Sequence, residues 1–409
     1  MLAKVAKKDK DIRDYRRFLT KKQEERLENL FKRLADKRVI HINSTSEGGG
    51  VAQILSGLVP LFNYKRFEVD WYKMEAESDF FKTTKKIHNF FQGQGLPLRS
   101  EEKRIYLKTN QRVADDLKKM DFDLLVVHDP QPLASTSFYK PTPAMLRFHL
   151  DSSQYENSFF DRFIQKYDKK VFSDKRHVIG KEAEIFPPAI DPLSDTNKPL
   201  DKAEKIIADL GLKTDKPILA QVSRFDKFKN PSGVVDIYKK VKKKLPDSQL
   251  ILFGIGGAED DPEAEEVFKR VKRRVAEDRD AHLFFYPDSI SHLKQNEKEI
   301  VNAIQGGADV VFQNSYREAF GLTVTEAMWK GQPVVGSTGV GIKKQIKDGE
   351  NGFIVKSSTE AAEKALKLIK NPDLKREMGS KAKRSVRRNY LITGLMINHL
   401  QAYVDLLDC

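Results

Sequence analysis

Short runs rich in β-branched residues alternate with longer amphipathic stretches over most of this chain. The runs that we interpret as strands lie at residues 38–43, 66–74, 123–129, 144–151, 217–223, 249–254, 282–288, 309–314 and 333–337. Helical patterns separate many of them, as at residues 51–62, 231–245, 262–277 and 297–307. Strands that alternate with helices form parallel sheets with helices on both faces. We therefore predict an α/β fold.

The length of 409 residues favours two domains over one. The segment "EIFPPAIDPLSDTNKPL", residues 184–200, sustains neither a helical nor a strand period and is interpreted as the linker. We predict two doubly wound, Rossmann-like domains, residues 1–190 and 191–388, that face each other across a cleft. A C-terminal helix within residues 389–409 is expected to pack back on the N-terminal domain. Ligands in such folds bind outside the carboxyl ends of the strands.

Several classes of protein are disfavoured by composition. The longest apolar runs are far shorter than the ~20 residues that cross a bilayer, and residues 1–19 lack the apolar stretch of a signal peptide. We expect a soluble, cytoplasmic protein that does not bind a membrane. The single cysteine, Cys409, allows no internal disulfide, and the histidines lack metal-ligand spacing. We expect neither a bound metal nor a cofactor.

The formal net charge of +14 indicates a surface that favours anions. A solvated, lysine-rich surface explains this charge most simply, and a basic cleft for a phosphorylated small molecule is an alternative. A nucleic-acid surface is a third reading, but the basic residues are spread along amphipathic helices rather than interleaved with aromatic residues. We expect no nucleic-acid partner.

Three consecutive glycines, Gly48 to Gly50, lie between the strand at 38–43 and the helix at 51–62. Glycine allows a ligand to approach the backbone closely, and a helix N-terminus offers unpaired N–H groups. A flexible turn is the alternative. We expect this loop, with Asn43 and Glu47 beside it, to contact a phosphate or a sugar.

Basic side chains follow the first strand of the second half. Arg224 and Lys229 lie in "SRFDKFKNP", just beyond the strand at 217–223. Arginine binds phosphate through its planar fork and lysine as a mobile point charge. A solvated basic loop is the plainer reading. Their place at a carboxyl end of the sheet favours a diphosphate site.

Two glutamates flank a glycine turn in "REAFGLTVTEAMWKGQPVV", residues 317–335. Glu318 follows the strand at 309–314, and Glu326 lies in the helix that begins near Gly321 and Leu322. A carboxylate accepts hydrogen bonds from neighbouring hydroxyls, so each glutamate suits one vicinal diol. Glutamates that cap a helix are the alternative. With helix N–H groups for phosphates, this arrangement fits a nucleotide sugar.

Polar residues also end two strands of the first half. Arg147, His149 and Asp151 alternate in "AMLRFHLD", and Asp129 and Gln131 follow the strand at 123–129. A histidine in such a place is usually structural. Opposite a sugar site, however, His149 becomes a candidate partner of a sugar hydroxyl, and buried polar groups need partners.

Together these segments resemble a known family. "SRFDKFKNP" and "REAFGLTVTEAMWKGQPVV" resemble the basic pair and the E-x7-E signature of retaining glycosyltransferases with the two-domain GT-B fold. "HINSTSEGGGVAQILSGLVPL", "VVHDPQPL", "FHLDSS" and "PPAIDPLS" resemble trehalose glycosyltransferring synthases and the related trehalose phosphorylases. The resemblance begins near residue 38 and covers nearly all of the remaining chain.

The resemblance implies a donor-binding C-terminal domain and an acceptor-binding N-terminal domain. Arg224 and Lys229 would bind the diphosphate, Glu318 the transferred glucose and Glu326 the ribose, with His149 near the reaction centre. The catalytic set implied is Arg224, Lys229, Glu318 and His149. The further donor-binding set is Gly49, Gly50, Phe320, Gly321, Leu322, Thr323 and Glu326. The acceptor-binding set is Asn43, Glu47, Asp129, Gln131, Arg147 and Asp151.

The implied activity is transfer of glucose, with retention, from a nucleoside diphosphate glucose to glucose, giving trehalose without a metal. A phosphorylase that uses glucose 1-phosphate, an enzyme with another acceptor, and a non-catalytic sugar- or nucleic-acid-binding regulator stay open, as does a homodimer. Phe228 and Asn230 depart from the residues usual in the family, which leaves the nucleotide base open.

Overall fold

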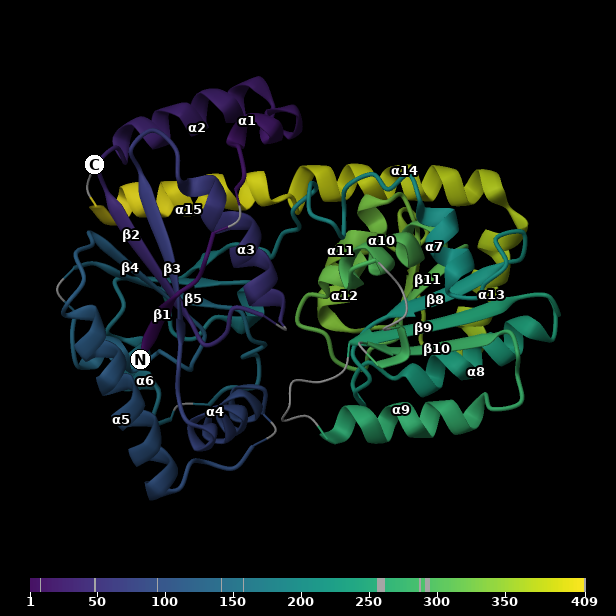
Figure 1. Cartoon of the computed structure of the whole chain (residues 1–409), viewed down its shortest axis with the longest axis horizontal. Helices are drawn as coiled ribbons and strands as arrows, with labels where there is room; N and C mark the ends of the chain where they lie inside the picture. Colours follow the sequence, from purple (N-terminus) through teal and green to yellow (C-terminus); the bar gives the residue numbers. More distant parts are fainter. Residues whose placement is uncertain are drawn as a thin grey trace. The chain divides into compact units, whose positions relative to one another are not determined.

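The computed structural model describes residues 1–7, 9–47, 49–93, 95–140, 142–156, 158–255, 262–286, 288–290 and 295–407. The chain divides into two compact units, which are coloured along the sequence in Figure 1. Unit 1 consists of Met1–Ala189 with Ile392–Cys409, and unit 2 consists of Ile190–Leu391. The sequence placed the start of the second domain at residue 191 and its end at 388. The C-terminal segment that belongs to unit 1 begins at Ile392.

The described strands of unit 1 form a seven-stranded sheet of order β1-β3-β2-β4-β5-β6-β7. They are β1 (Leu2–Lys4), β2 (Arg38–Asn43), β3 (Glu68–Met74), β4 (Leu124–His128), β5 (Ala144–Phe148), β6 (Lys169–Phe172) and β7 (Glu184–Ile185). Strand β1 is antiparallel to β3, and the other neighbours are parallel. The strand order changes direction between β2 and β4, where ligands bind in open parallel sheets.

Helices cover both faces of this sheet. Helices α2 (Lys21–Arg33), α3 (Gly50–Phe62) and α15 (Ile392–Leu407) pack together on one face, and α2 and α15 lie side by side in Figure 1. Helices α4 (Ser78–Phe91), α5 (Ser100–Leu117) and α6 (Asp161–Ile164) supply the apolar cluster on the other face. Short helix α1 spans Ile12–Tyr15.

The alternation of side chains along a strand determines what faces α15. Ile40 and Ile42 of β2 belong to the apolar cluster on the α4 and α5 face. Because neighbouring side chains point to opposite faces, His41 points to the other face, where its ring contacts Phe62 of α3 and Tyr403 of α15. The same parity places His128 and Arg147 on the α15 face of their strands.

The described strands of unit 2 form a six-stranded parallel sheet of order β10-β9-β8-β11-β12-β13. They are β8 (Ile218–Val222), β9 (Gln249–Ile255), β10 (Ala281–Tyr286), β11 (Val310–Gln313), β12 (Val334–Gly336) and β13 (Gly352–Ile354). In chain order this is the 3-2-1-4-5-6 arrangement of dinucleotide-binding folds. The order changes direction between β8 and β11, which pair directly.

Helices also cover both faces of the second sheet. Helices α8 (Pro231–Lys242), α9 (Pro262–Arg274) and α13 (Ser358–Lys370) pack on one face around an apolar cluster. Helices α7 (Ala203–Asp209), α10 (Glu297–Gly307), α11 (Leu322–Trp329) and α12 (Val340–Gln345) complete the unit, and α14 (Pro372–Asn389) contacts α11, α13 and β13.

The predicted α/β class, with two parallel-sheet units, is confirmed. Strands β1, β6, β7 and β13 were not predicted. They are short, with two to four residues each, so their sequences carry too few residues to display a period. In the part of the chain that the structure describes, no helix has the length and apolar content to cross a membrane.

Removing a buried side chain from α15 should destabilise unit 1 alone. Leu400 of α15 is fully buried, so Leu400→Ala should lower the free energy of unfolding of unit 1 by about 2–5 kcal/mol. The two tryptophans, Trp71 in β3 and Trp329 in α11, report on one unit each. Urea unfolding followed by the fluorescence of Trp71 in a Trp329→Phe background measures the loss.

The matched control places Leu400→Ala in a Trp71→Phe background, where the remaining Trp329 should report an unchanged midpoint. Gln401→Ala, at a partly exposed position of the same helix, should leave both midpoints nearly unchanged. Equal destabilisation of the two tryptophan transitions would contradict the assignment of α15 to unit 1.

Candidate active site

The loop after β8 is shaped by one carboxylate. Asp226 Oδ1 accepts hydrogen bonds from the backbone N–H groups of Phe228 and Lys229, both at 2.9 Å, and Asp226 Oδ2 lies 3.0 Å from Arg224 Nη2. Asn230 then adopts a left-handed conformation, φ 48°, and caps α8. The buried carboxylate therefore fixes the loop, while 54% of the Arg224 side chain stays exposed.

Gln221 joins this loop to the end of β11. Its Oε1 accepts from Asn314 N at 2.9 Å, and its Nε2 donates to Lys229 O at 3.0 Å. Tyr316 N also donates to Phe228 O at 2.7 Å. The loops after β8 and β11 are thus held together where the strand order changes direction.

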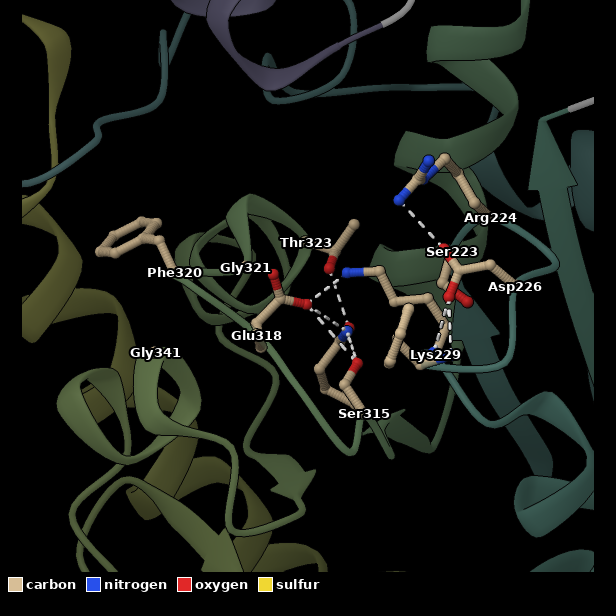
Figure 2. Close-up of polar contacts among 12 residues, drawn as sticks. Ser223, Arg224, Asp226, Lys229, Ser315, Glu318, Phe320, Gly321, Thr323 and Gly341 are labelled. Carbon is tan, nitrogen blue, oxygen red and sulfur yellow. Dashed lines mark hydrogen bonds and ion pairs between the residues drawn. The ribbon is translucent and has the colours of Figure 1, made fainter. Parts of the chain in front are cut away.

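The side chains of Lys229 and Glu318 meet at this place, as Figure 2 shows. Lys229 Nζ forms an ion pair with Glu318 Oε2, and their side chains are only 18% and 11% exposed. The same oxygen accepts from Gln313 Nε2 at 3.1 Å and lies 3.5 Å from Ser315 Oγ. Two residues predicted from distant segments, 89 positions apart, therefore form one partly buried polar cluster.

The start of α11 lies beside this cluster. Gly321, with φ 85°, occupies the N-cap position, and no side chain caps the helix. Thr323 Oγ1 donates to Gln313 Oε1 at 2.8 Å, which connects the first turn to the cluster around Glu318. The N–H groups of an uncapped first turn can bind an anion.

Phe320 plays a different part from the one expected. Its side chain is 6% exposed and packs against the ring of Tyr390, with centroids 5.4 Å apart. Figure 2 shows this side chain pointing away from Lys229. The ring therefore anchors the loop, and the predicted donor contact of Phe320 stays a prediction for its backbone.

Gly341, in the first turn of α12, supports the same segment. A Cβ added at Gly341 would lie 2.4 Å from Phe320 Cα and 2.5 Å from Phe320 N, and Gly341 N donates to Glu318 O at 2.8 Å. The backbone of residues 318–320 therefore needs a residue without a side chain at position 341.

Glu326 lies inside unit 2. The residue is 3% exposed, and its Oε2 accepts from Gln305 Nε2 of α10 at 3.1 Å. Gln305 Oε1 in turn accepts from Lys330 Nζ at 3.0 Å. Glu326 is thus held by α10 and linked through Gln305 to Lys330.

In unit 1, His149 follows β5 and is positioned through its backbone. His149 N donates to Asp129 Oδ1 at 2.7 Å. Asp129 is 4% exposed with φ 61°, and burial raises the pKa of its carboxyl to about 7. Asp129 therefore holds the segment that carries His149, and its predicted contact with an acceptor sugar stays a prediction.

Arg147 is also a structural group. The residue is 1% exposed, and its guanidinium donates to Val171 O and Phe186 O. Burial lowers the pKa of Arg147 to about 9. The backbone oxygens of neighbouring segments therefore occupy the guanidinium, and the expected contact of Arg147 with an acceptor stays a prediction.

The end of β2 and the loop after it contain Asn43, Glu47 and Gly49 from the predicted site. Asn43 Nδ2 donates to Thr45 O at 2.8 Å, and Thr45 Oγ1 donates to the backbone oxygen of exposed Glu47 at 2.9 Å. Gly49 has φ −152°, which any residue adopts, and an added Cβ would meet no atom within 4 Å. Neither the backbone nor packing among the described residues requires Gly49. Gly50 begins α3, and Gly48 lies outside the described residues.

The remaining acceptor candidates are partly exposed. Gln131 Nε2 lies 3.4 Å from His88 Nε2, while Gln131 Oε1 has no hydrogen-bond partner within the described ranges. Asp151 Oδ1 accepts from Ser153 N at 3.0 Å and lies 3.2 Å from His177 Nε2. Both side chains keep acceptor oxygens near the end of the sheet.

Sequence reasoning missed the residues that assemble the site: Gln221, Asp226, Gln313, Ser315 and Gly341. For three of these residues the sequence contains a pattern that could have indicated their role. Gln221 lies inside the otherwise apolar strand β8 and Gln313 ends β11, and a buried polar side chain needs a partner. Asp226 stands two and three residues before the N–H groups that it accepts, which is the spacing of an Asx turn.

Comparisons with known proteins identify the family and the fold. Residues 41–179 match the family model described as trehalose synthase, N-terminal domain, and residues 202–385 match glycosyl transferases group 1. Sucrose-phosphate synthase from Thermosynechococcus elongatus superposes with a TM-score of 0.66 at 17% identity, covering 91% of this chain and 99% of that chain. Fold and site together define a glycosyltransferase of the GT-B type.

Two curated relatives narrow this class. A trehalose synthase of Pyrococcus horikoshii is 41% identical over 97% of this chain and 96% of its own length. A trehalose synthase of Rubrobacter xylanophilus is 38% identical over 100% of both chains. The chain belongs to the trehalose synthase family.

Substitution by alanine should lower the stability of the protein much more at Gly341 than at Gly49. Gly341→Ala should lower the free energy of unfolding of unit 2 by about 1–3 kcal/mol, because the new Cβ collides with the backbone of Phe320. Gly49→Ala should lower the stability of unit 1 by less than about 1 kcal/mol, because Gly49 is the N-cap of α3 and alanine caps less well than glycine. If the loop closes on a substrate, Gly49→Ala should still slow turnover. Urea unfolding and initial rates measure both effects, and a stable, fully active Gly341→Ala would contradict the packing described.

Proposed function

We propose that this protein transfers glucose from a nucleoside diphosphate glucose to glucose, with retention of configuration, and so forms trehalose. The observation that carries the proposal is the meeting of Lys229 and Glu318, with Arg224 beside them, at the switch point between β8 and β11. The identity of 41% to a trehalose synthase over nearly the whole chain supports the product.

The donor diphosphate is assigned to Arg224, Lys229 and the first turn of α11. Arg224 is half exposed and can turn its fork toward a phosphate, and Lys229 supplies a second cation. In the structure the charge of Lys229 is balanced by Glu318. A bound diphosphate would share Lys229 with that carboxylate, and the N–H groups of Leu322 and Thr323 would complete its binding.

The donor sugar and the ribose are assigned to the two glutamates. Glu318 has one oxygen bonded to Lys229 and Gln313, which orients the carboxylate and leaves its other oxygen for glucose hydroxyls. Glu326 is assigned to the ribose diol, and Gln305 would orient it. Because Glu326 is buried, only a ribose that lies directly against the first turns of α11 can reach its carboxylate.

The reaction needs positive charge at the leaving group more than it needs a base. As the bond from glucose to the diphosphate breaks, negative charge develops on the phosphate oxygen, and Arg224 and Lys229 stabilise it. The acceptor hydroxyl attacks from the same face, and the leaving phosphate oxygen takes its proton. His149 would bind the transferred sugar, and Asn43, Glu47, Gln131 and Asp151 the acceptor. These roles require no metal and no cofactor besides the donor itself.

One assay panel tests the function. The purified protein is incubated with glucose and ADP-, UDP- or GDP-glucose, or with glucose 1-phosphate, and the disaccharide is identified with its anomeric configuration. The proposal expects α,α-trehalose from at least one nucleoside diphosphate glucose. Product from glucose 1-phosphate alone would indicate a phosphorylase, and no product from any donor would favour a binding protein without catalysis.

The basic pair should be indispensable for turnover. Arg224→Ala and Lys229→Ala should each lower kcat/KM by about a hundredfold or more, because charge on the departing diphosphate is no longer stabilised. Lys227→Ala removes the same charge from the same loop and should change kcat/KM by less than about threefold, since Lys227 Nζ lies over the Phe228 ring, 5.3 Å from its centroid, and Lys229 is the residue that pairs with Glu318. Full activity of Arg224→Ala or Lys229→Ala would overturn the assignment.

A further inference from the structure

Three histidines in unit 1 form a diagonal row that ends at His149. His41 of β2 pairs in register with Val126, and His128 lies two residues further along β4. His128 pairs with Arg147, and His149 again lies two residues further on. Each step moves one strand across the sheet and two residues toward its carboxyl end. Because two residues is the period of a strand, all three side chains share the α15 face.

Hydrogen bonds join the row from end to end. Tyr403 Oη of α15 lies 2.9 Å from His41 Nε2, His41 Nδ1 lies 2.9 Å from His128 Nε2, and His128 Nδ1 lies 3.0 Å from His149 Nε2. Neighbouring rings are tilted by only 23° and 19°, and their centroids are 5.1 and 5.3 Å apart. The nitrogen–nitrogen distances are much shorter than the distances between ring centroids. Neighbouring rings therefore meet edge to edge and lie nearly in one plane. An N–H of one ring then points along the lone pair of the next.

Burial favours the neutral form of each of these imidazoles. Burial lowers the pKa of His41, His128 and His149 well below the usual value. A neutral imidazole has one N–H donor and one acceptor nitrogen, so a row of three must run in one of two directions. Either every ring carries its hydrogen on Nδ1, or every ring carries it on Nε2.

The two directions of the row differ in how many buried groups lack a hydrogen-bond partner. If Tyr403 donates to His41 Nε2, all hydrogens of the row find acceptors except the one on His149 Nδ1, which has no partner within the described residues. In the opposite direction the Tyr403 hydroxyl hydrogen has no acceptor among those residues, and the His149 Nδ1 lone pair is unpaired as well. One unsatisfied buried group costs less than two.

We propose that Tyr403, His41 and His128 are positioning residues that fix His149 as the Nδ1–H tautomer, so that His149 presents a hydrogen-bond donor to a substrate oxygen. This inference rests on the proposed function, which places a sugar at His149. A hydroxyl oxygen of the transferred glucose or of the acceptor would satisfy the one donor of the row that has no partner among the described residues. No proton is transferred along the row, because only the direction of its hydrogen bonds matters.

The C-terminal helix thereby acquires a role in the site. Tyr403 is more than 250 positions from His149 in sequence, yet its hydroxyl decides which nitrogen of His149 carries hydrogen. The tautomer of a histidine is set by the partner of its other nitrogen. The row carries that effect through the covered face of the sheet, where water cannot compete.

The tautomers can be read directly by long-range ¹H–¹⁵N correlation of the imidazole rings in uniformly ¹⁵N-labelled full-length protein at neutral pH. Loss of a signal in His149→Ala identifies His149. We expect the pattern of a protonated Nδ1 and an unprotonated Nε2 for His149 in the wild type. In Tyr403→Phe the Nε2–H form should appear in a substantial fraction of the molecules. An Nε2–H or doubly protonated His149 in the wild type, or an unchanged tautomer in Tyr403→Phe, overturns the proposal.

Kinetics test whether the tautomer matters. Tyr403→Phe should lower kcat by about fivefold with little change in KM, because His149 then presents its N–H in only part of the molecules. Tyr167→Phe is the matched control, since its buried hydroxyl donates to Leu133 O at 2.8 Å and contacts no histidine of the row. This variant should lose similar stability and keep its kcat.

A double variant separates positioning from packing. If Tyr403 acts through His149, the variant with both Tyr403→Phe and His149→Ala should turn over at the rate of His149→Ala alone. An additional fivefold loss in the double variant would contradict the proposal. The NMR spectra need no substrate, so a failure of the proposed function leaves the tautomer test intact, and a reversed tautomer leaves the donor panel intact.

Discussion

The direct pairing of β8 with β11, out of chain order, is the constraint on which the candidate site depends. Parallel register brings the carboxyl ends of these strands together, so the loops after them must share the space beyond the sheet. Gln221 fastens the two loops, and Asp226 shapes the first of them. Only then can Lys229 reach Glu318, and any ligand that binds there meets both charges.

Unit 1 uses buried polar groups for a comparable purpose. Asp129 holds the backbone of His149, Arg147 holds the carbonyls of the neighbouring segments, and the histidine row reaches the imidazole from beneath. Buried polar groups are costly unless they are paired, and a paired network specifies one arrangement. The α15 face of the sheet therefore carries polar side chains where the opposite face is apolar. These polar side chains fix His149, which binds the transferred sugar in the proposed mechanism.

The alternation of strands and helices, the two units and the cluster of Lys229 with Glu318 could be predicted from sequence, because strand ends and glycine turns are local signals. Other features could not. Arg147 and His149 differ by one strand period, yet one is covered by α15 and the other extends beyond the strand. That difference depends on where β5 ends. The row needs three strands and a helix from the far end of the chain, so no local pattern reveals it.

The claim that unit 2 binds the donor diphosphate beyond β8 and β11 is tested most directly by hydrogen exchange with and without a nucleoside diphosphate. We predict that the diphosphate that binds most tightly in calorimetry slows exchange of the amides in residues 223–230 and 314–323, with little change in the strands of unit 1. Tight binding that protects neither segment, or protects only the loop after β2, would contradict the account.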